Sequence, residues 1–180
     1  RFAFGKARRQ TESIVRTAVT NVSARGALEV FDANARYLET VQFVATLDDR
    51  TTLICLDLDG TTWPPGSDDV VVPGADTHYQ CRSTIVPNPD FEKLGLPEPA
   101  EGTRFARRSP TEEGRVGKIE RISSSPTAEQ WLRNQSPERV RRILGRSRAD
   151  AFLAGEVDLS KMVRNDRSTV PLRELLGAGS

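Results

Sequence analysis

The feature that most constrains the fold is a long stretch of helical periodicity near the N-terminus. Apolar residues recur every three to four positions from Thr11 to about Tyr37, first as Ile14, Val15, Ala18 and Val22 and then as Leu28, Phe31, Ala35 and Leu38. At 1.5 Å per residue such a helix spans roughly 40 Å, which is long for a small domain. We therefore expect a long helix, broken or bent at Gly26, that packs against something outside its own chain.

Three short segments after this helix are typical of strands. Val41–Thr46 is β-branched and alternating, Thr61–Trp63 is followed by two prolines, and Gln80–Val86 is closed by Pro87. Together with the helix they predict a small antiparallel α+β unit.

Residues 88–120 show no sustained period and contain several prolines. The sequence predicts an extended arm here, with one helical turn near Phe91–Leu94. A structureless stretch of this length is unusual inside a compact domain, so we expect the arm to lie along a neighbouring molecule.

The last third of the chain predicts a cluster of short helices. Thr127 to Gln130 has the pattern of a capping box, and Ser136-Pro137-Glu138 opens a second helix that stops at Gly145. Further short helices are expected at 148–154, 159–163 and 171–176. The predicted fold is thus α+β, with an N-terminal helical region (1–40), a small β-rich core (41–87), an extended arm (88–125) and a C-terminal short-helix region (126–180).

Composition limits the size of the core and argues against a membrane protein. Hydrophobic residues make up 37% of the 180 residues and aromatic residues only 6%, so the core is expected to be thin. The chain begins with Arg1 and ends abruptly after a helical segment, which suggests a piece of a longer polypeptide. No apolar run approaches the ~20 residues of a membrane helix, and no signal-peptide pattern is present, so we expect synthesis in a cytoplasm.

Charge is unevenly distributed although the formal net charge is only +1. Basic residues dominate positions 1–25 and 101–150, and acidic residues dominate 47–69. Such alternation is usually a solvated surface, but clustered basic charge also suits an acidic partner or DNA. The basic run Arg139, Arg141, Arg142, Arg146 and Arg148 is by default a solvated helix face or the rim of a protein interface, and alternatively a surface that faces DNA.

Cys55, His78 and Cys81 are the most chemically suggestive set. Thiolates and neutral imidazoles are good zinc ligands, and the spacing His-x-x-Cys in a turn brings two donors to one ion. A structural zinc would need a fourth ligand, for which Asp57 and Asp59 are candidates. Alternatively the two cysteines pack side by side as small buried residues or form a disulfide; two cysteines are too few for a disulfide scaffold.

The aspartates that follow the first strand are expected to shape turns. Asp48 would cap a turn with Arg50 as a bidentate partner, and Asp59-Gly60 is a familiar hairpin turn. In the alternative reading, Asp48, Asp57 and Asp59 bind a divalent cation for phosphodiester chemistry. The P-loop, the dinucleotide fingerprint and the zincin motif are all missing, and His78 lacks an accompanying nucleophile motif, so no catalytic residue is predicted.

Several short motifs in fixed order resemble those of a known family. Ala45-Thr-Leu-Asp-Asp-Arg-Thr51, Leu58-Asp-Gly60, His78-x-x-Cys-Arg82 and Thr84 resemble the core signature of the phage Mu F-like head-morphogenesis (minor capsid) proteins. The long helix with Arg16-Thr17 is also similar to that family. The downstream motifs that look like its C-terminal pattern are Gly102-Thr-Arg104, Trp131-Leu132, Gln135, Ile143-Leu-Gly145, Arg148, Gly155, Leu159, Pro171-Leu172 and Glu174-Leu175. The resemblance covers roughly residues 11–176.

The resemblance implies a structural protein of the virion rather than an enzyme. Such proteins are low-copy components of the portal vertex that assist head assembly and DNA packaging or ejection. The implied partners are the portal protein, the major capsid protein or sister subunits, with packaged DNA as a further candidate. The implied location is the head interior, after assembly in the host cytoplasm. Relatives often have cysteines where this chain has Thr52 and Ser83.

Two other functions remain open from the sequence. Some relatives carry a toxin domain at the C-terminus, so the chain would then be the delivery portion of a phage-borne toxin. The second alternative is a metal-dependent nuclease that uses the aspartates and His78.

Overall fold

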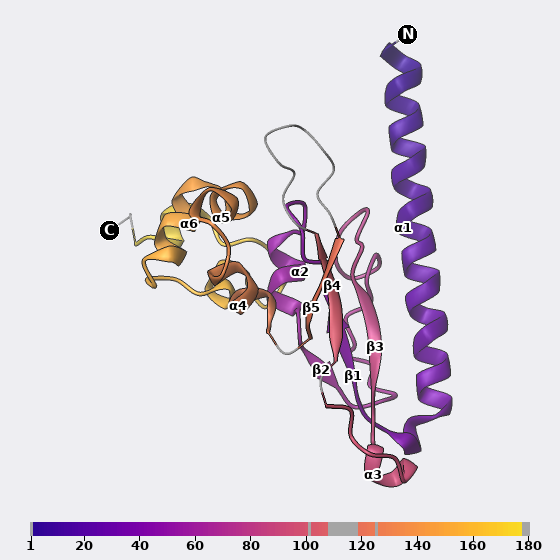
Figure 1. The fold of residues 1–180 in the computed structure, drawn as a ribbon. Coiled ribbons are helices and arrows are strands. Elements are labelled where there is room, and N and C mark those ends of the chain that lie inside the picture. Colours follow the sequence, from indigo (N-terminus) through magenta and orange to yellow (C-terminus); the bar gives the residue numbers. More distant parts are fainter. Residues whose placement is uncertain (1, 101, 108–118, 125, 178–180) are drawn as a thin grey trace. The chain divides into compact units, whose positions relative to one another are not determined.

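The computed structural model describes residues 2–100, 102–107, 119–124 and 126–177. Its internal contacts group the chain into two units. The first comprises Arg1–Val44 and Gly60–Glu98, and the second comprises Ala45–Asp59 and Pro99–Ser180. The predicted α+β class is confirmed: the chain has a long N-terminal helix, a small antiparallel sheet and several short C-terminal helices (Figure 1).

The long helix of the first unit, α1 (Phe2–Ala33), is longer than its sequence pattern indicates. Thr11 does not cap it, because the Thr11 hydroxyl donates to the carbonyl of Ala7 at 3.0 Å inside the helix. The predicted break at Gly26 is wrong, since α1 continues through that position. A short 3₁₀ turn, η1 (Ala35–Tyr37), follows.

Small and polar side chains form the face of α1 that packs on its own unit. Ala24 is buried on this face. The Thr17 hydroxyl accepts from the backbone N–H of Gln80 at 2.9 Å, and the Thr20 hydroxyl donates to the carbonyl of Cys81 at 3.1 Å. A Cβ atom at Gly74 would lie 3.0 Å from the carbonyl oxygen of Thr17, so only glycine permits this close approach. Most of the valines of α1 therefore lie away from the unit it packs on.

The sheet of the first unit has the strand order β2-β1-β3, and all pairs are antiparallel. Its strands are β1 (Leu38–Val44), β2 (Thr62–Trp63) and β3 (Thr84–Pro89). The inner face of the sheet is fully apolar, with Val41 and Phe43 0% exposed and Ile85 3% exposed. The three predicted strands are present, and the central one carries the core.

The third strand differs from its predicted bounds at both ends. It begins at Thr84 rather than Gln80, because Gln80 has a φ of 59° and cannot continue a strand. It continues through Pro87, which is paired with Val41, because β3 is an edge strand where a missing N–H is tolerated. The predicted helical turn that follows is confirmed as α3 (Phe91–Leu94), which is capped by the Asp90 carboxylate.

The second unit contains a strand pair where the sequence predicts an extended arm. Strand β4 (Thr103–Arg107) pairs antiparallel with β5 (Ile119–Ser123), from Thr103 opposite Ser123 to Arg107 opposite Ile119. The expectation of a structureless arm through residue 120 is therefore wrong. Each of these strands is short and rich in charge, so the segment has no apolar run that would reveal it. Residues 108–118 lie outside the described residues.

The remaining elements of the second unit are short helices around one apolar cluster. They are α2 (Leu53–Leu58), α4 (Ala128–Arg133), α5 (Pro137–Leu144), α6 (Arg146–Leu153), α7 (Leu159–Met162) and α8 (Leu172–Leu175). Leu132, Val140, Phe152 and Met162 are each 0% exposed in this cluster. The predicted caps are confirmed: Thr127 and Gln130 form a capping box, and Pro137 follows the cap Ser136.

The Thr127 capping box gives the first testable prediction. Thr127→Ala removes the oxygen that accepts from the Gln130 N–H, and we expect a loss of about 1 kcal/mol in the free energy of unfolding. Urea denaturation followed by circular dichroism measures it. Thr11→Ala is the matched control: it removes the same hydroxyl from a helix interior, where alanine is the better helix former, and should not destabilise.

Candidate functional site

Asp48 organises the turn that follows β1. Its carboxylate accepts from the Arg50 backbone N–H at 2.9 Å and from the Thr51 hydroxyl at 3.2 Å, and the Thr51 N–H donates to the Asp48 carbonyl at 3.3 Å. The sequence predicted a bidentate pair between the Arg50 guanidinium and Asp48. The hydrogen bond instead comes from the Arg50 backbone N–H, and the Arg50 side chain is exposed. Asp48 thus acts as a turn cap in the way short polar side chains do after strands.

Asp59 is a buried acceptor for four hydrogen bonds. Its carboxylate accepts from the backbone N–H groups of Ala45 and Ala128, each at 2.8 Å. The Arg104 guanidinium adds a bidentate ion pair, with N–O distances of 2.7 and 2.8 Å. The side chains of Asp59 and Arg104 are only 1% and 10% exposed. Because both oxygens of Asp59 are occupied, this carboxylate is not a fourth ligand for a metal.

The sequence predicted Asp59 as a turn residue or a metal ligand and did not indicate Arg104 as its partner. The following Gly60 has a φ of 86°, which favours glycine, and its N–H donates to the carbonyl of Phe43 at 2.9 Å. Asp59-Gly60 does not join two adjacent strands directly, since α2 stands between β1 and β2 in the chain. No local pattern reveals the Arg104 contact, because 45 positions separate the two residues.

Asp49 pairs with two of the five arginines that were candidates for an interface or for DNA contact. Arg139 donates to it at 2.8 Å and Arg142 at 2.9 Å. Arg139 is 6% exposed and its guanidinium lies 4.9 Å from the centre of the Trp131 ring, so it belongs to the interior of the second unit.

The other three arginines lie in three different environments. Arg141 pairs with Asp150 at 2.8 Å, Arg148 donates to the carbonyl of Val170 at 2.8 Å, and Arg146 is exposed. The five residues therefore do not form one continuous exposed surface, because Arg139 is buried, Arg148 is half-buried, and acidic side chains pair with Arg139, Arg141 and Arg142. A role in DNA binding for this run stays a prediction.

The structure brings Cys55, His78 and Cys81 together as a group of potential metal ligands. One ligand atom from each lies within 4.8 Å of the others. Cys55 is on α2, and His78 and Cys81 lie in the loop before β3; both cysteines are buried, and neither is part of a disulfide. Zinc–ligand bonds of about 2.0–2.3 Å place tetrahedral ligands about 3.3–3.8 Å apart, a spacing within the 4.8 Å limit that the three ligand atoms share.

The environment of His78 suits a ligand. Nδ1 lies 2.8 Å from the carbonyl oxygen of Tyr79. A carbonyl only accepts, so Nδ1 carries the proton and Nε2 of the neutral ring keeps its lone pair. The hydrogen bond with the Cys81 side chain raises the pKa of His78, burial lowers it, and the hydrogen bond with Tyr79 raises it further. The resolved shift is upward, which favours the protonated ring, so a metal ion would compete with a proton for Nε2.

The acidic site required by the nuclease alternative does not form within the described residues. Among them, Cys55, His78 and Cys81 make up the one group of three or more potential ligands, and Asp48, Asp57 and Asp59 do not join it. Burial, followed by the negative charge of Glu129, raises the pKa of Asp57.

Comparison with family models, curated proteins and solved structures finds no match for this chain. None of the described helices combines the length and apolar character that a membrane-spanning segment requires.

Proposed function

We propose that this chain is a structural minor capsid protein of a tailed phage, with a role in head assembly and in DNA packaging or ejection. The observation that carries the proposal is how the aspartates of the family-like motifs are used. Asp48 caps a turn, Asp49 pairs with two arginines, and Asp59 accepts four hydrogen bonds from its own chain. Carboxylates committed to the fold favour a structural over a catalytic role.

The proposed partners are the portal protein, the major capsid protein or sister subunits, and packaged DNA is a further candidate. The proposed location is the head interior at the portal vertex, after assembly in the host cytoplasm. The long α1 supports this proposal, because a helix of 32 residues with exposed valines offers a large surface to neighbouring subunits.

Purified heads of the phage that encodes this chain provide the test. Quantitative mass spectrometry of the heads is expected to find the chain at low copy number relative to the major capsid protein. Protease treatment of intact heads should leave the chain uncleaved, and treatment of opened heads should cleave it. Absence of the chain from purified heads would contradict the proposal.

We further propose that Cys55, His78 and Cys81 hold a structural zinc ion. The support is the chemistry of the donors, two thiols and an imidazole, within 4.8 Å of one another. Bound zinc would link segments that are far apart in sequence and so stabilise the fold.

The zinc proposal predicts about one ion per chain in elemental analysis of protein purified without chelator. Cys81→Ser should remove the ion, because a hydroxyl is a poor zinc ligand, and should lower the melting temperature. Asp57→Asn is the control, since Asp57 is outside the group and should leave the zinc content unchanged. Fewer than about one ion per several chains in the unmodified protein would reject this proposal without bearing on the virion role.

A further inference from the structure

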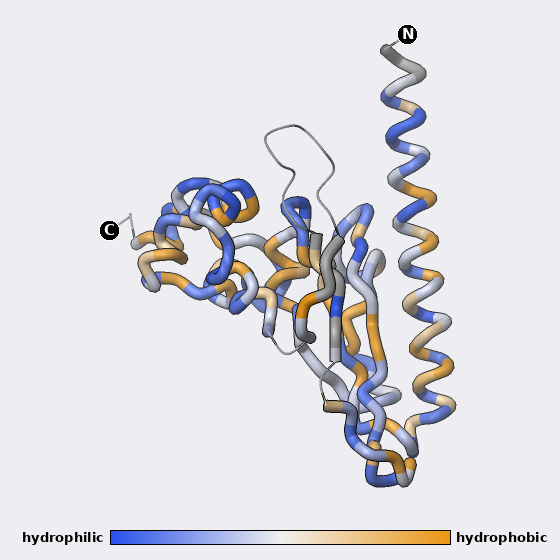
Figure 2. The backbone as a smooth tube through the Cα atoms, in the orientation of Figure 1, coloured by the Kyte–Doolittle hydropathy of each residue, from blue (hydrophilic) through white to orange (hydrophobic). Residues whose placement is uncertain are grey.

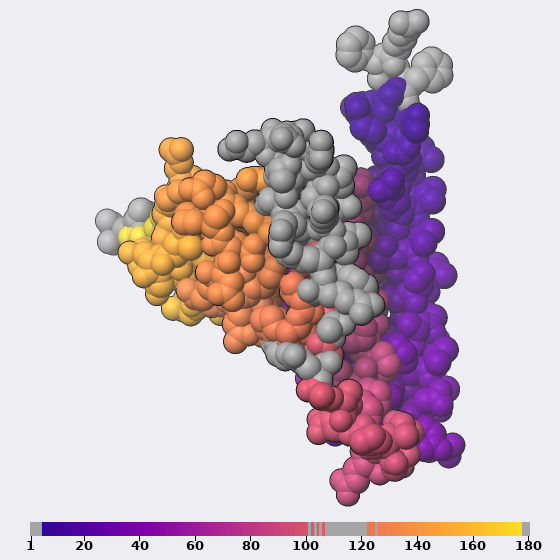
Figure 3. All heavy atoms as spheres, in the orientation of Figure 1, coloured from indigo at the N-terminus to yellow at the C-terminus, as the bar shows by residue number. Residues whose placement is uncertain are grey.

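The side of α1 that points away from its own unit carries exposed apolar side chains between charged ones. Ile14, Val15, Val19, Val22 and Val30 are between 53% and 70% exposed. Hydrophobic positions recur along α1 (Figure 2), and the side chains on one side of the coloured part of α1 are in view in Figure 3. Exposed β-branched residues repeated on one helix are typical of an interaction surface.

Four of the residues on this face repeat at intervals of seven. Arg8, Val15, Val22 and Glu29 follow one line along α1. The flanking positions, three and four residues further on, are Thr11, Glu12, Ala18, Val19, Arg25 and Gly26, of which Ala18 and Gly26 leave room for the side chains of another helix. We call this line with its flanking positions the heptad stripe.

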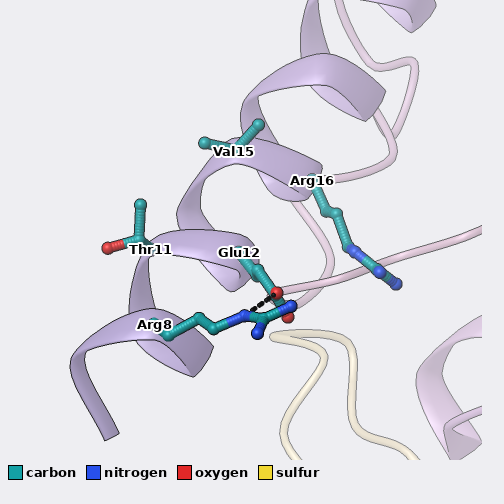
Figure 4. A pocket seen from close by; sticks show the side chains of 5 residues that line it. All are labelled: Arg8, Thr11, Glu12, Val15 and Arg16. Atoms are coloured by element: carbon teal, nitrogen blue, oxygen red, sulfur yellow. Dashed lines mark hydrogen bonds and ion pairs between the residues drawn. The ribbon is translucent and has the colours of Figure 1, made fainter. Parts of the chain in front are cut away.

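The shape of the stripe matches that of a helix-pairing surface. Figure 4 shows a surface hollow lined by Arg8, Thr11, Glu12 and Val15, with Arg16 beside them. The spacing i, i+3, i+4, i+7 is the set that surrounds a side chain inserted from a facing helix in a coiled coil. One heptad later, Val15, Ala18, Val19 and Val22 form an equivalent set that is entirely apolar.

We propose that the heptad stripe docks against the same stripe of a second copy of this chain, with the two α1 helices antiparallel. The stripe is basic at Arg8 and acidic at Glu29, with Val15 and Val22 between them. Antiparallel pairing centred between Ala18 and Val19 sets Arg8 opposite Glu29 and Val15 opposite Val22. Parallel pairing in register sets Arg8 opposite Arg8 and Glu29 opposite Glu29, which repel.

The charged side chains at the ends of the stripe are available to form ion pairs with a second copy. Arg8 is paired with Glu12 at 2.9 Å, but the two side chains are 81% and 47% exposed. An exposed ion pair of this kind is weak, so exchanging it for an intermolecular pair costs little. Antiparallel helix dipoles add a further small preference for the same orientation.

The size of the stripe predicts a weak dimer. A stable interface buries roughly 800 Å² on each partner, and a seam on one helix supplies less. We therefore expect a concentration-dependent monomer–dimer equilibrium with a Kd above about 1 μM.

Sedimentation velocity of the full 180-residue chain, at concentrations rising to several hundred micromolar, tests the docking surface. We expect dimer to accumulate with concentration, and Val22→Lys to raise the dissociation constant by about tenfold or more. Ile14→Lys is the matched control, because Ile14 is 64% exposed on the same helix but lies off the stripe; it should leave the equilibrium unchanged. A monomer at every concentration, or equal effects of the two variants, overturns the inference.

Charge reversal tests the orientation. Arg8→Glu and Glu29→Arg should each weaken the dimer, and the double variant should restore it, because the antiparallel pairs are then rebuilt in reverse. In a parallel dimer each single reversal exchanges one like-charge pair for another, so single reversals without effect would overturn the antiparallel arrangement. The inference does not rest on the virion role, since dimer formation in solution is measured without particles.

Discussion

Asp59→Ala is expected to lower the free energy of unfolding of the second unit by about 3–5 kcal/mol. The substitution leaves the Arg104 guanidinium largely buried, with a side chain that is 10% exposed, and without its counter-ion. It also removes the acceptor for the backbone N–H groups of Ala45 and Ala128. A buried charge and two buried donors without a partner are each costly, so the sum is large.

Denaturant unfolding followed by circular dichroism measures this loss, and Asp158→Ala is the matched control. Asp158 also pairs with an arginine, Arg133, at 2.8 Å, but its side chain is 49% exposed. An exposed pair is worth at most about 1 kcal/mol, so the control separates the effect of burial from that of charge. A loss below about 1 kcal/mol for Asp59→Ala would show that Arg104 regains solvent and that the cluster does not hold the unit together.

The elements that were predicted correctly from the sequence have local causes. The Thr127–Gln130 capping box and the Ser136-Pro137 helix start depend on residues within four positions of each other. The helical period of α1 is likewise local, although the pattern missed the first turns because residues 2–10 are mostly charged or small.

The elements that were missed depend on contacts between distant residues. Strands β4 and β5 are short and their apolar residues do not form a run, so their pairing is not visible in either segment. The extension of β3 through Pro87 requires knowing that β3 is an edge strand. Arg104 is 45 positions from Asp59, and nothing near it in sequence indicates that its charge is buried.

The candidate site shows the same division. The spacing of His78 and Cys81 predicts their proximity, because three residues in a turn bring two side chains together. The grouping of Cys55 with His78 and Cys81 depends on the fold. The sequence suggested Cys55 as a ligand only because it is a cysteine. The predicted alternative ligand Asp59 was wrong because its burial and its bond to Arg104 are tertiary features.

Phe43→Ala is expected to lower the free energy of unfolding of the first unit by about 3–5 kcal/mol. Phe43 is 0% exposed on the central strand β1, directly opposite Ile85 of β3. The aromatic content of the chain is only 6%, so few large side chains are available to fill the space that the ring leaves. A cavity in a small core that cannot collapse costs the lost burial and the lost packing contacts together.

Hydrogen exchange read by mass spectrometry is the suitable measurement, because it resolves the peptides of β1 and β3 from those of the second unit. Exchange in the sheet should accelerate by about a hundredfold or more, as expected for a loss of about 3 kcal/mol. Val19→Ala is the control: Val19 is 60% exposed, so its truncation should leave sheet exchange unchanged. If Phe43→Ala and Val19→Ala give the same exchange rates, the interior of this sheet contributes little, and the stability of the first unit must come from α1 and its partners instead.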